Sequence, residues 1–360
     1  MTERTYYDAN ELRAFVRRAL VALDVRDEDA ALVSEILGAS DMRGIESHGV
    51  ARLERFYVDR IRDGFIDPRA RETTTRETAT SLAIDANNAL GHPVGDRVMR
   101  RTIAKAADAG CAIATVGHSN HYGIAGYYAM LALEHDMIGI SSTNAGRLAA
   151  PTGGRDLMLG TNPFAYAIPA ADGDAFVLDM ATTTVALGKL EIAGRLGKPL
   201  QPGWAIDADG AMTLDPQAGM LGALLPLGGY GMGNGGHKGF GLGLLADILC
   251  GVLGSGVMVP DMPPSTHVLD PAITSHFFAA IRIDAFRDVA AFKTDLSRLL
   301  NDMRSSAPAP GHERVYVAGD LERSREHAHR ETGIGLDPVV VESLESVSRK
   351  TGVAPPRPRA

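Results

Sequence analysis

The sequence predicts a mixed α/β (α+β) fold, with helices at both ends of the chain and strands in the middle. Apolar residues recur at helix spacing over residues 12–61, and again over 288–303 and 339–350. Between residues 81 and 283, short apolar runs of strand length alternate with helical segments. Several of these runs end in small polar residues, which commonly present a ligand site at the edge of a sheet.

The bulk composition is that of an ordinary globular protein. The chain has 360 residues, 45% hydrophobic and 22% charged, with a formal net charge of −8. This acidic balance argues against nucleic acid and anionic membranes as partners. The N-terminus lacks an apolar signal segment, and no apolar run approaches the ~20 residues that span a bilayer. A cytoplasmic location is therefore expected. Cys111 and Cys250 lie in apolar runs and are expected to be buried rather than paired.

The first predicted helices lead to a polar segment that carries Ser47 and His48. Asp8, with Glu11 three residues later, is expected to cap the first helix. Ser47 lies near the start of a third helix, where serine is a common cap. A nucleophilic role for Ser47 is not expected, because adjacent helical residues do not face one another and no Gly-x-Ser-x-Gly turn surrounds it. His48 is a candidate general acid.

Arg52 is expected to share a helix face with His48, because it follows four residues later. An arginine beside a proton-transferring histidine suits a substrate carboxylate. The alternative is a surface salt bridge between Arg52 and Glu46 or Glu54.

A glycine-rich turn with two histidines occupies residues 117–126. It follows the apolar run 111–116, a predicted buried strand, and precedes a predicted helix whose N-terminus would attract anions. His118 and His121 could be solvated turn residues or half of a metal site, but the turn supplies no cysteine or carboxylate as a further ligand. No metal is predicted. Proton exchange with a substrate oxygen fits these histidines better.

A second glycine-rich stretch contains the dinucleotide-binding string Gly231-x-Gly233-x-x-Gly236. A Rossmann site requires this string between a strand and a helix of a compact βαβ unit. Here a Pro-Gly segment precedes it and a proline-rich loop follows the next helix, so a Rossmann fold is not expected. Lys238, at the start of that helix, could bind a phosphate or be a solvated surface residue.

Five segments resemble, in order, the signatures of the malate/L-lactate dehydrogenase family (type 2, the sulfolactate dehydrogenase-like NAD(P)-dependent oxidoreductases). The resemblance extends from about residue 7 to about residue 335. The segments are 41–53 (DMRGIESHGVARL), 119–128 (SNHYGIAGYY), 160–163 (GTNP), 178–182 (LDMAT) and 237–241 (HKGFG).

This resemblance implies a hydride-transferring enzyme that uses NAD or NADP, with NAD favoured, on a non-Rossmann fold. Members of the family have a mostly antiparallel mixed sheet with flanking helices, and they form homodimers. By matched position, His48 is the implied proton donor with Ser47 as its polar partner, His121 is the alternative acid/base, and Arg52 lies on the substrate side. The implied cofactor contacts are Tyr122, Gly123, Ile124, Ala125, Asn144, Thr161, Asp179, Met180, Ala181, Lys238, Gly319 and Asp320.

Lys189 bears on the choice of substrate. It follows Gly188 at the position where members that reduce cyclic imino acids carry an aspartate. The resemblance therefore favours a small-molecule carboxylate substrate, a 2-hydroxy acid such as malate, lactate or sulfolactate. The alternatives are reduction of a cyclic imino acid (piperideine- or pyrroline-2-carboxylate) and ureidoglycolate oxidation. Outside this chemistry, the alternatives are an inactive nicotinamide-binding protein and a serine hydrolase.

The predicted domain organisation has four parts. They are an N-terminal helical segment that carries Ser47 and His48 (1–75), a central cofactor- and substrate-binding α/β domain (76–283), C-terminal helices that pack back on the N-terminal segment (284–352) and a disordered tail (353–360).

Overall fold

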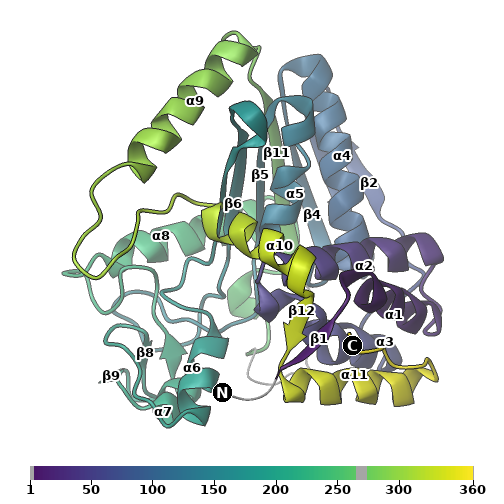
Figure 1. Ribbon diagram of the computed structural model, residues 1–360, viewed down its shortest axis with the longest axis vertical. Coiled ribbons are helices and arrows are strands. Elements are labelled where there is room, and N and C mark those ends of the chain that lie inside the picture. Colours follow the sequence, from purple (N-terminus) through teal and green to yellow (C-terminus); the bar gives the residue numbers. More distant parts are fainter. Residues whose placement is uncertain (1–3, 265–273, 360) are drawn as a thin grey trace.

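A computed structural model describes residues 4–264 and 274–359, and a seven-stranded sheet lies at its centre (Figure 1). Among its described strands only β3 and β4 pair in parallel, and all other neighbours are antiparallel. This arrangement confirms the predicted non-Rossmann, mostly antiparallel mixed sheet. In spatial order the strands are β2 (Thr73–Glu77), β3 (Ser81–Asp85), β4 (Cys111–Ser119), β11 (Thr274–Arg282), β5 (Met137–Thr143), β6 (Phe164–Pro169) and β7 (Ala175–Met180).

Two helices cover one face of this sheet, α4 (Gly91–Ala109) and α5 (Ala125–Met130). Apolar residues recur along α4 at helix spacing, and Val94 and Val98 are fully buried in one core with Phe278 of β11. Neighbouring side chains of a strand point to opposite faces, so Phe277 packs on the other side against Cys250. Cys250 belongs to η6 (Ile248–Val252), which contacts β11. Cys250 is buried as expected, whereas Cys111 at the start of β4 is exposed, so the expectation is wrong for Cys111.

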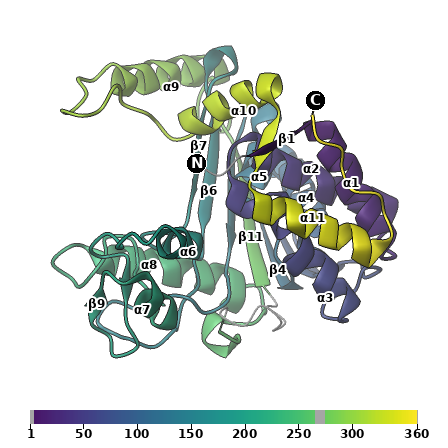
Figure 2. The same cartoon turned by 60° about the horizontal axis from the view of Figure 1, so that its bottom comes forward.

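Both ends of the chain build a helical lobe beside the sheet (Figure 2). β1 (Thr5–Tyr7) pairs with β12 (Ile334–Leu336), and α11 (Pro338–Thr351) packs on η2 and η3. Phe15 and Leu344 belong to the same buried core, one from each end. The predicted cap is confirmed, because the Asp8 side chain accepts a hydrogen bond from Asn10 N. The remaining elements of this lobe are α1 (Ala9–Val21), α2 (Asp27–Met42), η1 (Glu46–His48), η2 (Val50–Arg52), η3 (Leu53–Val58) and α3 (Asp59–Arg62).

The tail that was predicted to be disordered runs alongside β1. Arg359 N donates to Tyr6 O at 2.7 Å, and Pro358 forms a bridge with Tyr7. The structure thus differs from the expectation for residues 353–359, because backbone pairing orders a segment whose composition predicts none. The predicted boundary at residue 75 falls inside β2, a strand of the central sheet.

A smaller lobe lies across from the helical lobe (Figure 2). Leu190 and Leu200 are buried in its own core. The string Gly231-x-Gly233-x-x-Gly236 leads directly into α8 without a βαβ unit, as expected. The elements of this lobe are α6 (Leu187–Arg195), β8 (Ala205–Ile206), β9 (Met212–Thr213), α7 (Pro216–Leu221), β10 (Ala223–Leu224) and α8 (Gly236–Asp247).

The remaining helical elements connect these parts. α9 (Val289–Arg304) is an outlying helix, and α10 (Asp320–Thr332) contacts α2 (Figure 1). Short turns are η4 (Leu133–His135), η5 (Ala171–Gly173) and η7 (Val259–Asp261). In the described part of the chain, no helix is long and apolar enough to cross a membrane.

Candidate active site

Asp41, at the end of α2, holds the segment that carries Ser47, His48 and Arg52. Its carboxylate accepts a hydrogen bond from Val50 N at 2.9 Å. Glycine is needed at position 49, because a β-carbon there would lie 1.7 Å from Asp41 Oδ1. Burial raises the pKa of Asp41 to about 7. The predicted Ser47 cap is therefore wrong, since Asp41 satisfies the first backbone N–H of η2.

Ser47 and His48 contact each other although they are adjacent in the chain. Ser47 Oγ lies 2.9 Å from His48 Nδ1. The expectation that these side chains diverge assumed α-helical geometry and is wrong, because η1 is a 3₁₀ turn. Loss of hydration lowers the pKa of His48 to about 4, and Arg52 acts in the same direction. His48 is thus neutral at neutral pH, and its Nε2 has no hydrogen-bond partner among the described residues.

His121 stands next to His48, with 5.5 Å between the ring centroids. The Tyr57 hydroxyl lies 2.6 Å from His121 Nδ1, and Gly123 N donates to the same nitrogen at 3.4 Å. Loss of hydration, together with the neighbouring His48, holds the pKa of His121 well below its usual value. The site therefore contains two neutral histidines with engaged Nδ1 atoms, and the described residues give neither Nε2 a partner.

His118 lies apart from this pair. It belongs to β4, in a left-handed backbone conformation (φ 52°), and its Nδ1 lies 3.0 Å from Asp85 Oδ2. Of the two histidines in the turn, only His121 therefore belongs to the candidate active site. Within residues 4–264 and 274–359, no three or more His, Cys, Asp or Glu side chains are grouped as a metal site would require.

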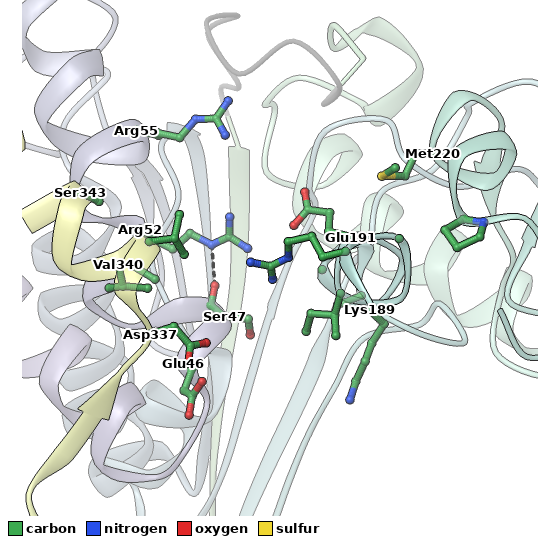
Figure 3. A pocket seen from close by; sticks show the side chains of 18 of the residues that line it. Glu46, Ser47, Arg52, Arg55, Lys189, Glu191, Met220, Asp337, Val340 and Ser343 are labelled. Carbon is green, nitrogen blue, oxygen red and sulfur yellow. Dashed lines mark hydrogen bonds between the residues drawn. The ribbon is translucent and has the colours of Figure 1, made fainter. Parts of the chain in front are cut away.

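A cleft of about 1750 Å³ separates η2 and α11 from α6. Arg52 lies 4.9 Å from the Phe56 ring centroid, and its Nε donates to Ser47 O at 2.5 Å. Figure 3 shows Arg52 and Glu191 extending into the cleft from opposite walls, whereas Lys189 of α6 points away from Arg52. Among the described residues no carboxylate forms an ion pair with Arg52.

The alternative of a surface salt bridge is therefore not found, because both candidate carboxylates are engaged elsewhere. Glu46 pairs with Arg4 at 2.8 Å, and Glu54 pairs with Lys350 at 2.9 Å. This leaves the Arg52 guanidinium available to a ligand carboxylate.

A second cavity, of about 280 Å³, opens between β7, α5 and the start of α10. Asp179 lines this cavity and accepts a hydrogen bond from Gly126 N at 2.7 Å. Partial loss of hydration raises the pKa of Asp179 to about 6, although the residue remains exposed in the single chain. Ile124, Gly319 and Arg43 line the same cavity. Predicted cofactor residues from three distant segments thus meet here.

Two of the predicted cofactor residues are committed to internal packing. Tyr122 is buried between Tyr128 and His276, with ring centroids 4.6 and 4.3 Å away. Asn144 is buried and donates to Asp247 Oδ1 at 2.8 Å. Their side chains hold the sheet together, and only their backbone atoms remain for a ligand.

The remaining predicted cofactor residues have varied surroundings. Arg304 and Arg323 donate to the Asp320 carboxylate at 2.8 and 2.6 Å, so its oxygens are engaged in a salt-bridge network. Lys238 is exposed at the start of α8. Four of them lie within two chain positions of Ile124 or Asp179, which line the smaller cavity; they are Gly123, Ala125, Met180 and Ala181. The fifth, Thr161, pairs with the same segment, because its carbonyl accepts a hydrogen bond from Thr182 N.

Three polar residues of this region were not predicted. Tyr57 falls within the apolar helical pattern of residues 12–61, which predicted no polar role for it. His92 is fully buried and lies 6.4 Å from the His121 ring, and the described residues give neither of its ring nitrogens a hydrogen-bond partner. The buried Nε of Arg147 likewise has no partner in the described part of the chain. Its position just after the polar end of β5 is a signal that could have identified Arg147, whereas nothing in the sequence marks His92.

The site pairs two neutral histidines with an arginine that has no carboxylate partner among the described residues, a combination that suits an anionic substrate from which a hydroxyl proton is exchanged. A family model described as malate/L-lactate dehydrogenase matches residues 7–345 of the chain. The chain belongs to this family. It is an enzyme that interconverts a 2-hydroxy acid and its 2-oxo acid.

Individual relatives cover nearly the whole chain. A malate dehydrogenase of Pyrococcus horikoshii is 41% identical over 361 residues, which are 98% of this chain and 99% of the relative. An L-sulfolactate dehydrogenase of Methanothermobacter thermautotrophicus is 32% identical over 338 residues, covering 94% and 95%. The crystal structure of malate dehydrogenase from Entamoeba histolytica superposes with a TM-score of 0.93 at 32% identity, covering 99% of this chain and 100% of that one.

Dehydrogenases of this family use NAD or NADP, and the residues present fit such a group. Asp179 offers carboxylate oxygens to the smaller cavity, where they suit ribose hydroxyls. At the start of α8, Thr152 Oγ1 is buried and has no hydrogen-bond partner among the described residues, and it lies 3.3 Å from where a β-carbon on Gly236 would lie. Lys238 is exposed on the same helix turn, and a helix N-terminus with a lysine suits phosphate.

Proposed function

We propose that the chain catalyses the NAD-dependent interconversion of a malate-like 2-hydroxy dicarboxylic acid and its 2-oxo acid. The observation that carries this proposal is the stacked pair of His48 and His121, joined through Ser47 to the cleft that Ser47 and Arg52 line. A bound nicotinamide would accept the C2 hydride in oxidation and return it in reduction.

The cleft offers positive charge on two walls. Arg52 would bind the C1 carboxylate through its guanidinium fork. On the facing wall, α6 carries two cations, Lys189 and Arg195, and one carboxylate, Glu191, and all three line the cleft. The excess of cations on this helix would favour a second anionic group on the substrate, and therefore malate or sulfolactate over lactate.

His121 is the residue we assign to proton exchange. Its partner Tyr57 is fully buried, so water does not compete for this hydrogen bond, whereas Ser47 is exposed and its bond to His48 competes with solvent. A tyrosine hydroxyl both donates and accepts, so Nδ1 can gain or lose a proton without losing its partner. Nε2 of His121 then exchanges the proton of the substrate C2 oxygen. His48 packs against the ring and completes the pocket.

The charge of the smaller cavity supports NAD over NADP. Two carboxylates, Asp179 and Glu322, and one cation, Arg43, line it, so a 2′-phosphate there would meet an excess of negative charge. Ribose hydroxyls would instead donate to Asp179.

An absorbance assay of nicotinamide oxidation tests this function. NADH and NADPH are each combined with oxaloacetate, 3-sulfopyruvate, pyruvate and a cyclic imino acid at neutral pH. We expect the highest kcat/KM with NADH and a dianionic 2-oxo acid. Turnover with the cyclic imino acid alone would contradict the assignment of Arg52 and Lys189. A preference for pyruvate would contradict the role of the α6 cations.

We also propose that the enzyme is a homodimer that associates through α8 and η6. The apolar side chains on this surface are 39–57% exposed in the single chain, and large apolar patches of this kind mark association surfaces. They are Leu242, Leu244, Leu245, Ile248, Val252 and Leu253.

A further inference from the structure

We propose a second binding site, for an organic anion with two or more carboxylate or phosphate groups, where α1, α2, α5 and α10 meet. The cavity there has a volume of about 570 Å³, within the range of metabolite-binding pockets. No residue that lines it also lines the catalytic cleft. The site is therefore separate from the one that binds the hydroxy acid, and it shares one residue, Arg43, with the smaller cavity at Asp179.

Positive charge predominates on the walls of this cavity. Four arginines line it, and only two carboxylates do, those of Asp8 and Glu326. The Asp8 carboxylate is engaged as the cap of α1, where it accepts from Asn10 N at 2.8 Å. A confined surface with an excess of guanidinium groups attracts an anion. The four are Arg13, Arg43, Arg330 and Arg359.

Two of these arginines have no carboxylate partner among the described residues. Arg13 has no hydrogen-bond or ion-pair partner there, and its Nε is buried. Arg359 donates only to a backbone carbonyl, that of Glu331, at 2.8 Å. A buried donor without an acceptor costs free energy, and ligand oxygens would remove that cost.

The other two arginines share a single carboxylate. Arg330 holds Glu326 at 2.6 Å, which leaves Arg43 a long contact of 3.5 Å with the same side chain. Arg43 is only 8% exposed, so solvent does little to stabilise its charge. This cation is incompletely paired, as expected at a site that receives an anion.

The backbone is shaped around Arg13. Its side chain lies against Gly38 of α2, where a β-carbon would come within 2.5 Å of Arg13 Nε. Only glycine therefore lets the guanidinium lie in this position. Tyr127 and Met130 of α5 form an apolar part of the wall, which suits the carbon skeleton of a ligand.

Binding of citrate and of inorganic pyrophosphate, by calorimetry on the full chain, tests the site. The probes separate the two anion chemistries, because one offers carboxylates and the other phosphates. We expect at least one of them to bind, and to raise the Tm because it binds the folded state. In the double variant Arg13→Gln/Arg359→Gln the affinity should fall by roughly tenfold or more, since two charge-assisted contacts to the ligand are lost.

Matched controls locate the site. Arg18→Gln lies on α1, is exposed and does not line the cavity, so it should leave the affinity unchanged. Arg52→Gln removes the cation of the catalytic cleft, and binding should persist in it. The proposal is overturned if wild type binds neither probe at millimolar concentration. It is also overturned if the double variant binds like wild type, or if Arg52→Gln or saturating NADH abolishes binding.

Discussion

His121 and His48 differ in how firmly their Nδ1 atoms are held, so replacement by alanine should affect them unequally. We expect His121→Ala to lower kcat by about 10²–10⁴, the usual value of general acid–base catalysis, and His48→Ala to lower it about tenfold. Steady-state kinetics measures both. Fluorescence titration with NADH should give nearly the wild-type Kd for each variant. If His48→Ala lost more kcat than His121→Ala, His48 rather than His121 would be the residue that exchanges the proton.

Tyr57 should act through His121 as a positioning residue. Its hydroxyl can accept from Nδ1–H when the imidazole is cationic. In Tyr57→Phe this acceptor is lost, which lowers the pKa of His121 further. The acid limb of the kcat/KM profile for hydroxy-acid oxidation should therefore move to lower pH, with kcat reduced about tenfold.

Tyr127→Phe is the matched control for Tyr57→Phe, because its hydroxyl bonds Glu35 at 3.2 Å, on α2 rather than at the histidine pair. It should leave the pH profile unchanged. An unshifted profile in Tyr57→Phe, with normal kcat, would mean that Tyr57 only fills space.

Among the elements, the connection from α2 to η2 depends on the close approach of Gly49 to Asp41. In Gly49→Ala the new methyl group would overlap the Asp41 carboxylate, which must then move away from Val50 N. Overpacking of this kind costs about 1–3 kcal/mol. We expect a lower Tm and a lower kcat/KM, because Arg52 lies on the displaced turn. Gly233→Ala, where no atom lies within 4 Å, is the control and should behave like wild type.

The sequence predicted the regular elements of the central domain well. Strands expected at 81–85 and 137–142 are observed as β3 and β5, and the helix expected at 94–107 is observed as α4. The sequence patterns that predict them are local, because the spacing of apolar residues can be recognised without knowing which strands pair. The domain boundaries stay a prediction, although β1 and β12 pair the two chain ends.

What the sequence did not reveal depends on contacts between distant segments. Tyr57 reaches His121 across 64 positions of the chain, and Asp41 caps a turn nine positions away. The pairing of Arg359 with Tyr6 likewise orders a tail whose composition predicts disorder. Spacing rules for a single helix cannot describe such contacts. The catalytic and binding roles of the site residues also stay a prediction, because a motif match gives the position of a residue in the chain but not its geometry in the site.

At the scale of the whole molecule, the buried histidines should determine how the free energy of unfolding changes at acidic pH, because they lose hydration on folding. Folding lowers the pKa of His48 to about 4 and those of His92 and His276 to about 3. Each stays neutral when folded but takes a proton when unfolded below pH ~6.5, so each loses about 1.4 kcal/mol of stabilisation per pH unit as the pH falls towards its folded pKa.

Two carboxyl groups act in the opposite direction over the same range. Folding raises the pKa of Asp41 to about 7 and that of Asp179 to about 6, so their protonation favours the folded state as the pH falls. Since more histidines than carboxyl groups are involved, we expect the free energy of unfolding to decrease from pH 6.5 to pH ~4.

His92→Leu should flatten this pH dependence, and it also removes two buried nitrogens to which the described residues offer no hydrogen bond. Urea unfolding at several pH values measures the slope. His327→Leu, at a side chain that is 79% exposed, should leave the slope unchanged. Equal slopes in wild type and His92→Leu would contradict the assignment of acid lability to this residue.

The proposed dimer can be tested at α8, because leucines of this helix are partly exposed in the single chain. Leu245 is 43% exposed, so Leu245→Asp should not disturb the folded protomer, yet it would place an unpaired charge in the interface. Light scattering after size exclusion should give a dimer for wild type and a monomer for Leu245→Asp. Leu299→Asp on α9, at a side chain that is 51% exposed, should remain a dimer. If Leu245→Asp remained a dimer, the interface would not include this part of α8. If wild type were a monomer, the proposed dimer would be wrong.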